Sequence, residues 1–253
     1  MARTNTADTA NYLLAGSAPV TDSPFSFACW ASVDVTNNAG MGLMYAGNSG
    51  SGIDVMRLTC QGNVANDPVR IQLRNNVGDS NFADSTAGPT DATWFHAAGT
   101  SSATDTVRAY FNGGNSGSAS GAMASPSISE SGIGMWRAGA SISQALDGAI
   151  GHAAWWDIEL SAAQIATLAG GLHPYLMAPA NLQGYLPMTG ASAGAEVDLV
   201  SGISYAETGT MGQSGQPHVV VWPAWPSVSR QAAAAGGLTI PVAMHSYRKR
   251  RAA

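Results

Sequence analysis

The chain has 253 residues, of which 45% are hydrophobic, enough to bury the core of one large domain and too many for a disordered protein. The formal net charge is −5 although Arg248, Lys249, Arg250 and Arg251 all lie at the very end, so the rest of the chain is acidic and has no other lysine. This balance argues against nucleic-acid binding by the main domain. No stretch approaches the roughly 20 apolar residues of a membrane-spanning helix, and the N-terminus lacks a signal-peptide core. We therefore expect a cytoplasmically synthesised chain with no membrane partner.

Short strand-like segments, separated by turns rich in Gly, Asn, Asp and Ser, recur along most of the chain. This spacing predicts an antiparallel two-layer sandwich, because parallel strands would need crossover helices of about a dozen residues. Cys29 and Cys60 lie inside two of the segments and are expected to be buried thiols. Residues 113–127, GGNSGSASGAMASPS, resemble a turn-forming stretch. The expected strands are residues 25–35, 42–45, 53–60, 69–73, 93–99, 106–112, 134–138, 149–156 and 182–186.

The strand expected before residue 157 alternates with a period of two. In residues 146–155, Ile150, His152 and Ala154 alternate with the neighbouring small and apolar residues, as in a strand that is covered on both faces.

One short amphipathic helix follows this strand. Ser161 and Gln164 have the spacing of a capping box, and Gly170 and Gly171 supply the stop. The helix has only two to three turns, so it must lie on a sheet to be stable.

The C-terminal part changes character after Pro226. Residues 219–222 form a short apolar strand before PAWP, and residues 227–237 form a small-residue linker. Beyond the linker, apolar residues alternate along an edge-type strand interrupted by Pro241. Such an arm would suit pairing with a neighbouring subunit, and completion of its own sandwich is the equal alternative. The partner-binding residues of the arm are predicted to be Leu238, Ile240, Val242, Met244, Tyr247, Arg248, Lys249, Arg250 and Arg251.

The basic end of the arm allows three interpretations. It is a solvated terminus, a docking segment for an acidic neighbour, or, in third place, a contact with packaged nucleic acid.

Three segments carry a family pattern in the right order: PFSFACWASVDV, WFHAAGTSSATDTVRAYFNGG and ALDGAIGHAAWWDIELSAAQIATLAGG. They resemble the laminin G-like, concanavalin A-like jelly roll over about residues 11–205. The resemblance implies an all-β fold: an antiparallel two-sheet jelly-roll sandwich with one short helix and an extended C-terminal arm. We expect the sandwich in residues 1–226 and the linker and arm in residues 227–253. The matching positions are Trp94, His96, Val107, Tyr110, Phe111, Asn112, Gly113, Asp147, Gly148, Trp155, Trp156, Leu160 and Ser161.

Glycosidases of this fold carry a Glu-x-Asp-x-x-Glu strand, which supplies the nucleophile and the acid of a retaining mechanism. Here Glu196 and Asp198 begin the pattern, but Ser201 stands where the acid should be. Ser, His and Asp are all present, but their sequence context selects no catalytic triad. The sequence therefore predicts a protein that is not an enzyme.

Metal and cofactor sites have no strong pattern either. His96 and His152 lie in strand patterns and are expected to be core or edge histidines. The resemblance leaves calcium as a candidate ligand, because some domains of this fold bind it. The acids that could bind calcium here are predicted instead to be solvated turn carboxylates. These acids are Asp54, Asp67, Asp79, Asp84 and Asp91.

Tryptophans in the strand patterns are mostly expected in the core: Trp30, Trp94, Trp136, Trp155 and Trp156. Trp222 and Trp225 flank prolines instead. They either close one end of the sandwich or stack on a sugar ring as a glycan-binding platform.

The leading hypothesis from the sequence is a non-enzymatic structural protein of a tailed bacteriophage virion, most simply a capsid decoration or head-associated subunit attached through its arm. The virion setting leans on the resemblance and on the low-charge, Gly-rich composition. The expected partners are the major capsid protein or other virion proteins and further copies of the chain in a homo-oligomer. The alternative is a carbohydrate-binding, lectin-like module of a phage tail or fibre, with a surface glycan as its ligand.

Overall fold

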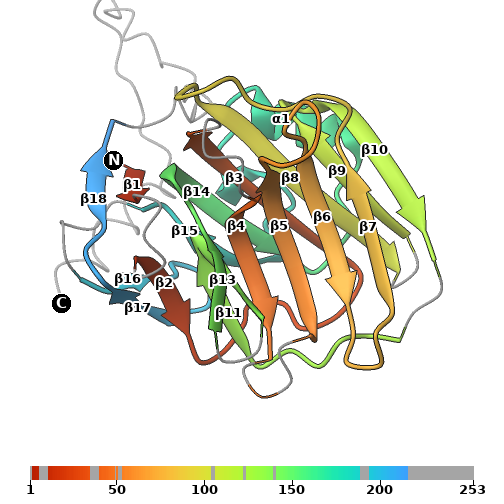
Figure 1. Cartoon of the computed structure of the whole chain (residues 1–253), viewed down its shortest axis with the longest axis horizontal. Helices are drawn as coiled ribbons and strands as arrows, with labels where there is room; N and C mark the ends of the chain where they lie inside the picture. Colours follow the sequence, from red (N-terminus) through yellow and green to blue (C-terminus); the bar gives the residue numbers. More distant parts are fainter. Residues whose placement is uncertain are drawn as a thin grey trace, which may run out of the picture. The chain divides into compact units, whose positions relative to one another are not determined.

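A computed structural model describes residues 2–5, 11–34, 40–48, 50, 53–103, 106–121, 124–138, 141–188 and 194–215. These residues form two large antiparallel β-sheets packed face to face (Figure 1), as the strand spacing predicted. The domain boundary at residues 226 and 227, the arm, and the strand expected at residues 219–222 all lie outside the described residues.

Sheet A is built around the adjacent strands β3 and β14, which lie within the first and third family segments. Its strand order is β10 (Gly114–Ser120), β9 (Thr106–Phe111), β8 (Phe95–Ala103), β3 (Phe25–Val33), β14 (Gly148–Trp156), β1 (Ala2–Asn5) and β18 (Gly212–Ser214), and β15 (Leu182–Leu186) also pairs with β14.

Sheet B lies against sheet A and ends at β7, beside β10 of sheet A. Its order is β16 (Glu196–Val197), β17 (Ser204–Thr208), β2 (Tyr12–Ala15), β11 (Glu130–Ile133), β4 (Gly40–Gly47), β5 (Val55–Gln61), β6 (Val69–Arg74) and β7 (Ser80–Asp84). A separate hairpin of β12 (Met135–Ala138) and β13 (Ser141–Ala145) packs on β4.

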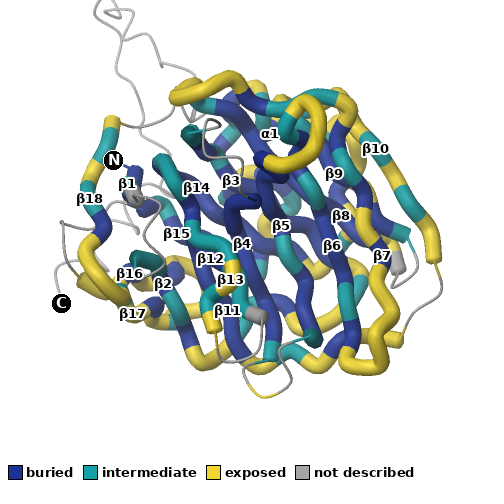
Figure 2. The backbone as a smooth tube through the Cα atoms, in the orientation of Figure 1, coloured by how far each residue is buried: buried dark blue, intermediate teal, exposed yellow. Residues whose placement is uncertain are grey.

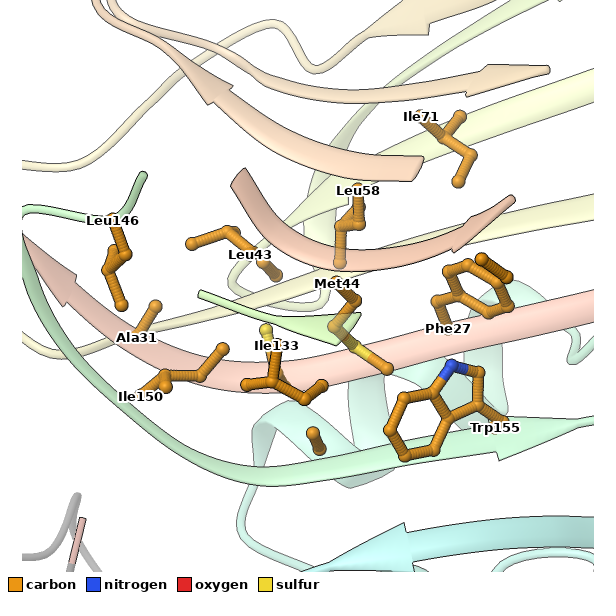
Figure 3. Close-up of a cluster of buried hydrophobic side chains, with 14 of the residues drawn as sticks. Phe27, Ala31, Leu43, Met44, Leu58, Ile71, Ile133, Leu146, Ile150 and Trp155 are labelled. Carbon is orange, nitrogen blue, oxygen red and sulfur yellow. The ribbon is translucent and has the colours of Figure 1, made fainter. Parts of the chain in front are cut away.

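The main core fills the space between the two sheets (Figure 3). Phe27 and Trp155 of sheet A meet Met44 and Leu58 of sheet B there, and all four side chains are buried. Period-two alternation explains this layer, since inward residues of facing strands interdigitate while their neighbours point outward. In Figure 2 the strands are mostly buried, and the turns are exposed.

Cys29 and Cys60 are buried free thiols in this core, as expected. Burial, together with the nearby charge of Asp67, raises the pKa of the Cys60 thiol to about 12, so it stays protonated at neutral pH.

The helix predicted after the strand is α1 (Ala162–Ala169), with Ser161 as its N-cap and a complete capping box to Gln164. Ile165 and Leu168 are its buried residues, and they join a second apolar cluster with Trp156 on the side of sheet A that faces away from sheet B. The short 3₁₀ helix η2 (Pro174–Leu176) follows α1 and contacts β15. Among the described residues α1 is the one α-helix, and no helix there is long and apolar enough to cross a membrane.

The sequence-based prediction was wrong for β10 and for the alternation along β14. Residues 114–120 were expected to form turns but make the edge strand β10. Backbone hydrogen bonds to β9 hold this strand in place, and its small side chains carry no alternation from which a strand could be predicted. The alternation along β14 also breaks: a register shift between Gly151 and Ala154, with His152 at φ +52°, places Ile150 and Ala153 in the main core and Ala154 in the second cluster.

Candidate functional site

The face of sheet B that is turned away from sheet A carries a row of polar and aromatic side chains. Inward residues Leu58, Ile71 and Ala83 belong to the main core, so their neighbours on β5, β6 and β7 point outward. The strand register places Arg57 beside Gln72, and Gln72 beside Phe82. We call this region the arginine face; its residues are Arg57, Arg70, Gln72, Arg74, Ser80, Phe82, Asp84 and Trp136.

Arg57 stands at the centre of the arginine face. Its Nε donates a hydrogen bond of 2.7 Å to Oε1 of Gln72, and its guanidinium lies 3.6 Å from the centre of the Trp136 ring. Gln72 in turn donates through Nε2 to Ser80 Oγ at 2.6 Å. A cation over an aromatic ring and a chain of directed hydrogen bonds hold this guanidinium in one place.

Arg70 lies one row further along and is paired. Its Nε and Nη2 donate to the two carboxylate oxygens of Asp84 at 2.6 and 2.7 Å, and its guanidinium lies 4.2 Å from the centre of the Phe82 ring. Phe82 is 44% exposed, so this aromatic ring presents apolar area to solvent. Asp84, expected to be a turn carboxylate, is therefore a strand residue in an ion pair.

The β12–β13 hairpin brings Trp136 to this face. Trp136 donates from Nε1 to Gln144 Oε1 at 2.6 Å, which fixes the orientation of the indole. Arg137 donates to Glu130 Oε2 of β11 at 2.9 Å and so ties the hairpin to sheet B. Gly42 makes the close packing possible, because a Cβ there would lie 2.3 Å from the carbonyl carbon of Met135.

Two cavities lie among the loops, away from the arginine face. One, of about 250 Å³, is lined by Ser32, Asp34, Asp147 and Ser214 among other residues near the ends of β3 and β14. The other, of about 320 Å³, lies between the Asn66 turn and residues 86–89. Neither described lining contains an aromatic ring, whereas the arginine face combines rings with fixed hydrogen-bond donors.

The carboxylates that begin the incomplete glycosidase pattern are engaged within the fold. Glu196 is buried and accepts from Arg3 Nε at 3.0 Å. One oxygen of Asp198 accepts the backbone amides of Tyr185, Val200 and Ser201, which stabilises the turn after β16. These two acids therefore have structural partners in the fold.

The acids considered for calcium do not gather. Asp54 accepts the amide of Asn76, while Asp79 accepts from Asn75 Nδ2 in the turn between β6 and β7. Asp67 lines the cavity of about 320 Å³. Within the described ranges, no group of three or more His, Cys, Asp or Glu residues lies close enough together to hold a metal ion.

The predicted histidines are buried strand residues. His96 packs beside Trp30, with 5.5 Å between ring centroids. His152 Nδ1 lies 2.6 Å from the hydroxyl of Tyr185, which also contacts His173 Nε2 at 3.2 Å. This network lies beside the second apolar cluster, to which Tyr185 belongs.

Of the tryptophans expected in the core, Trp155 and Trp156 are fully buried, whereas Trp30, Trp94 and Trp136 are only half-buried. Trp222, Trp225 and the predicted partner-binding residues of the arm lie outside the described residues.

Sequence reasoning did not find the arginine face. Its signal was present as the alternating polar residues of VRIQLR at residues 69–74 and as the single arginine of VMRLTCQ at residues 55–61. The alternation shows that these side chains share a strand face, but only the register of β5, β6 and β7 brings them together.

The antiparallel sandwich, with its helix on sheet A, defines a lectin-like protein of the jelly-roll class. A family model of the laminin G group, described as the concanavalin A-like lectin/glucanases superfamily, matches residues 7–166, and the chain belongs to this family. The search of curated proteins gave no match.

Several solved structures share the fold. A candidate carbohydrate-binding protein from Bacteroides ovatus is 16% identical, with a TM-score of 0.57, and the match covers 87% of this chain; the chain spans only 61% of that protein's length. A heptameric SAP-like pentraxin from Limulus polyphemus is 12% identical, with a TM-score of 0.52, over 81% of this chain and 92% of the pentraxin. The carbohydrate-binding module CBM40 of a Ruminococcus gnavus sialidase, bound to α2,6 sialyllactose, is 11% identical, with a TM-score of 0.52, over 67% and 97% of the two chains.

Proposed function

We propose that the chain is a non-enzymatic glycan-binding module whose binding site is the arginine face. The observation that carries this proposal is the row of Trp136, Arg57, Gln72 and Phe82 across the outer side of sheet B. Aromatic rings pack against the apolar faces of sugars, and guanidinium and amide groups form directed hydrogen bonds with hydroxyls. Carbohydrate-binding relatives of the fold support the same reading.

The non-enzymatic part rests on Glu196 and Asp198. Retaining hydrolysis needs two carboxyl groups about 5–5.5 Å apart around the bond that is cleaved. Here Arg3 pairs with Glu196, while backbone amides hold Asp198, and the third position of the pattern is Ser201.

The experiment is an immobilised glycan array with the full chain, followed by titration of the best ligand. Trp136→Ala and Phe82→Ala should each weaken binding by about tenfold or more, as truncation of an aromatic anchor does. Trp94→Ala is the matched control, because Trp94 is also half-buried but precedes β8 of sheet A. Loss of binding in Trp94→Ala with normal binding in both the Trp136→Ala and the Phe82→Ala variants would move the site to sheet A.

The virion setting is a separate part of the proposal. A tail or fibre module that binds a surface glycan fits the arginine face better than a decoration subunit does, because a decoration subunit would attach through arm residues 227–253 and would not need this face. Particle binding by the chain cut after Ser229, compared with the full chain, tests the attachment role of the arm.

A further inference from the structure

The arginine face concentrates positive charge on an otherwise acidic molecule. The described residues contain six arginines, and three of them, Arg57, Arg70 and Arg74, lie on this face. The register places them on adjoining rows, with Arg57 opposite Gln72, Arg70 opposite Thr59, and Arg74 opposite Val55. All three are half-buried, so their charges stand partly out of water and are screened less than those of fully exposed side chains.

Only one of these charges is balanced locally. Asp84 neutralises Arg70 through two hydrogen bonds. Arg57 is held by the neutral partners Gln72 and Trp136, and its Nη1 is buried without a hydrogen bond to any described atom. No described carboxylate pairs with Arg74. The face therefore carries two positive charges in excess, because the half-buried side chains of Arg57 and Arg74 have no carboxylate partner among the described residues.

The three guanidinium groups also repel one another. Burial, and then the nearby charges of Arg70 and Arg74, lower the pKa of Arg57 to about 10. Arg57 remains charged at neutral pH, so repulsion among the guanidinium groups raises the free energy of the face without a ligand. A bound anion would reduce this repulsion.

We infer that the ligand of the arginine face is an anionic glycan, whose carboxylate or sulfate group is bound by Arg57 and Arg74 between Trp136 and Phe82. Guanidinium groups match planar and tetrahedral oxyanions because they offer paired, directed N–H donors. A long polyanion such as nucleic acid fits less well, since two excess charges release few counterions and the rest of the chain is acidic. This inference rests on the proposed glycan-binding function and names its ligand class.

The test is calorimetric titration of the full chain with matched pairs of oligosaccharides. One pair is an oligosaccharide with a uronic acid and the same compound with the carboxyl group reduced to an alcohol. The other pair is a sulfated oligosaccharide and its desulfated form. We expect one charged member to bind at least about tenfold more tightly than its neutral partner, as a charge-assisted hydrogen bond requires. The pair that shows the difference identifies carboxylate or sulfate as the bound group.

Arg57→Gln and Arg74→Gln should each remove most of this preference, because each change weakens binding of the charged member far more than binding of the neutral member. Arg74→Gln is the safer variant for folding, because Arg57 also supports Gln72 and Trp136. Arg108→Gln is the matched control, since Arg108 is an exposed arginine on β9 of sheet A. Raising the ionic strength from about 0.01 M to about 0.15 M shortens the Debye length from ~30 Å to ~8 Å and should weaken only the charged ligand.

Equal affinity for charged and neutral members would overturn the inference and leave glycan binding intact. Equally tight binding of a short DNA oligonucleotide would also overturn it, because the face would then select charge alone. Failure to bind any oligosaccharide would contradict the proposed function itself.

Discussion

His96 is a buried imidazole that the fold keeps neutral. Its Nδ1 makes no hydrogen bond to any described atom, and burial lowers its pKa from 6.5 to about 3. The unfolded chain therefore binds a proton at His96 below about pH 6.5, while the folded chain does not. The free energy of unfolding should fall with decreasing pH, by up to about 1.4 kcal/mol per pH unit from this residue, until about pH 3.

His96→Phe keeps an aromatic ring beside Trp30 and removes the titrating group. Urea denaturation at a series of pH values should show a shallower loss of stability in the variant between about pH 6 and pH 4. Parallel pH profiles for the two proteins would show that His96 is not held neutral by folding.

The β12–β13 hairpin is the element on which the arginine face depends. Gly42→Ala would place a Cβ 2.3 Å from the Met135 carbonyl carbon, so the hairpin must move away from β4 and carry Trp136 with it. We predict that this variant loses glycan affinity about as strongly as Trp136→Ala, by about tenfold or more. Gly16→Ala is the matched control, because a Cβ at Gly16 meets nothing within 4 Å. Unchanged affinity in Gly42→Ala would mean that the position of Trp136 does not matter.

Comparison of the predicted elements with the observed ones shows which helices and strands the sequence alone could predict. Ser161 and Gln164 predicted the start of α1 because a capping box is a local signal. β10 was missed because Gly and Ser side chains carry no alternation, and its pairing with β9 becomes visible only in the fold. The arginine face was missed for a related reason. Arg57 is on β5 and Arg70 is on β6, and the register between these two strands cannot be inferred from the sequence of either strand alone.

A buried ion cluster links the N-terminal strand β1 to strands β16 and β17, which lie about 190 residues later in the chain. Arg3 of β1 is fully buried and pairs with Glu196 of β16 at 3.0 Å and with Glu207 of β17 at 3.5 Å. Glu207 also accepts the backbone amide of Met211 before β18, at 2.6 Å. Contacts across more than 190 residues leave no local pattern, so the sequence singled out Glu196 but neither Arg3 nor Glu207 as its neighbours in this cluster.

Arg3→Met should destabilise the fold by about 3–5 kcal/mol, because it leaves two buried carboxylates without their cation. Urea unfolding of the variant and of the unmodified chain at pH 7 measures this loss. A loss below about 1 kcal/mol at pH 7 would mean that the cluster resembles an exposed ion pair.

At the scale of the whole molecule, we assign glycan binding to only one of the two outer faces of the sandwich. α1 covers part of sheet A with apolar side chains, whereas the outer side of sheet B presents arginines and half-buried aromatic rings. The most direct test of this assignment is a crystal structure of the full chain with the tightest ligand from the glycan array. We predict that the sugar ring lies between Trp136 and Phe82, with its anionic group within hydrogen-bond distance of Arg57 or Arg74. A glycan bound in the cavity lined by Asp34 and Asp147, with the arginine face empty, would contradict it.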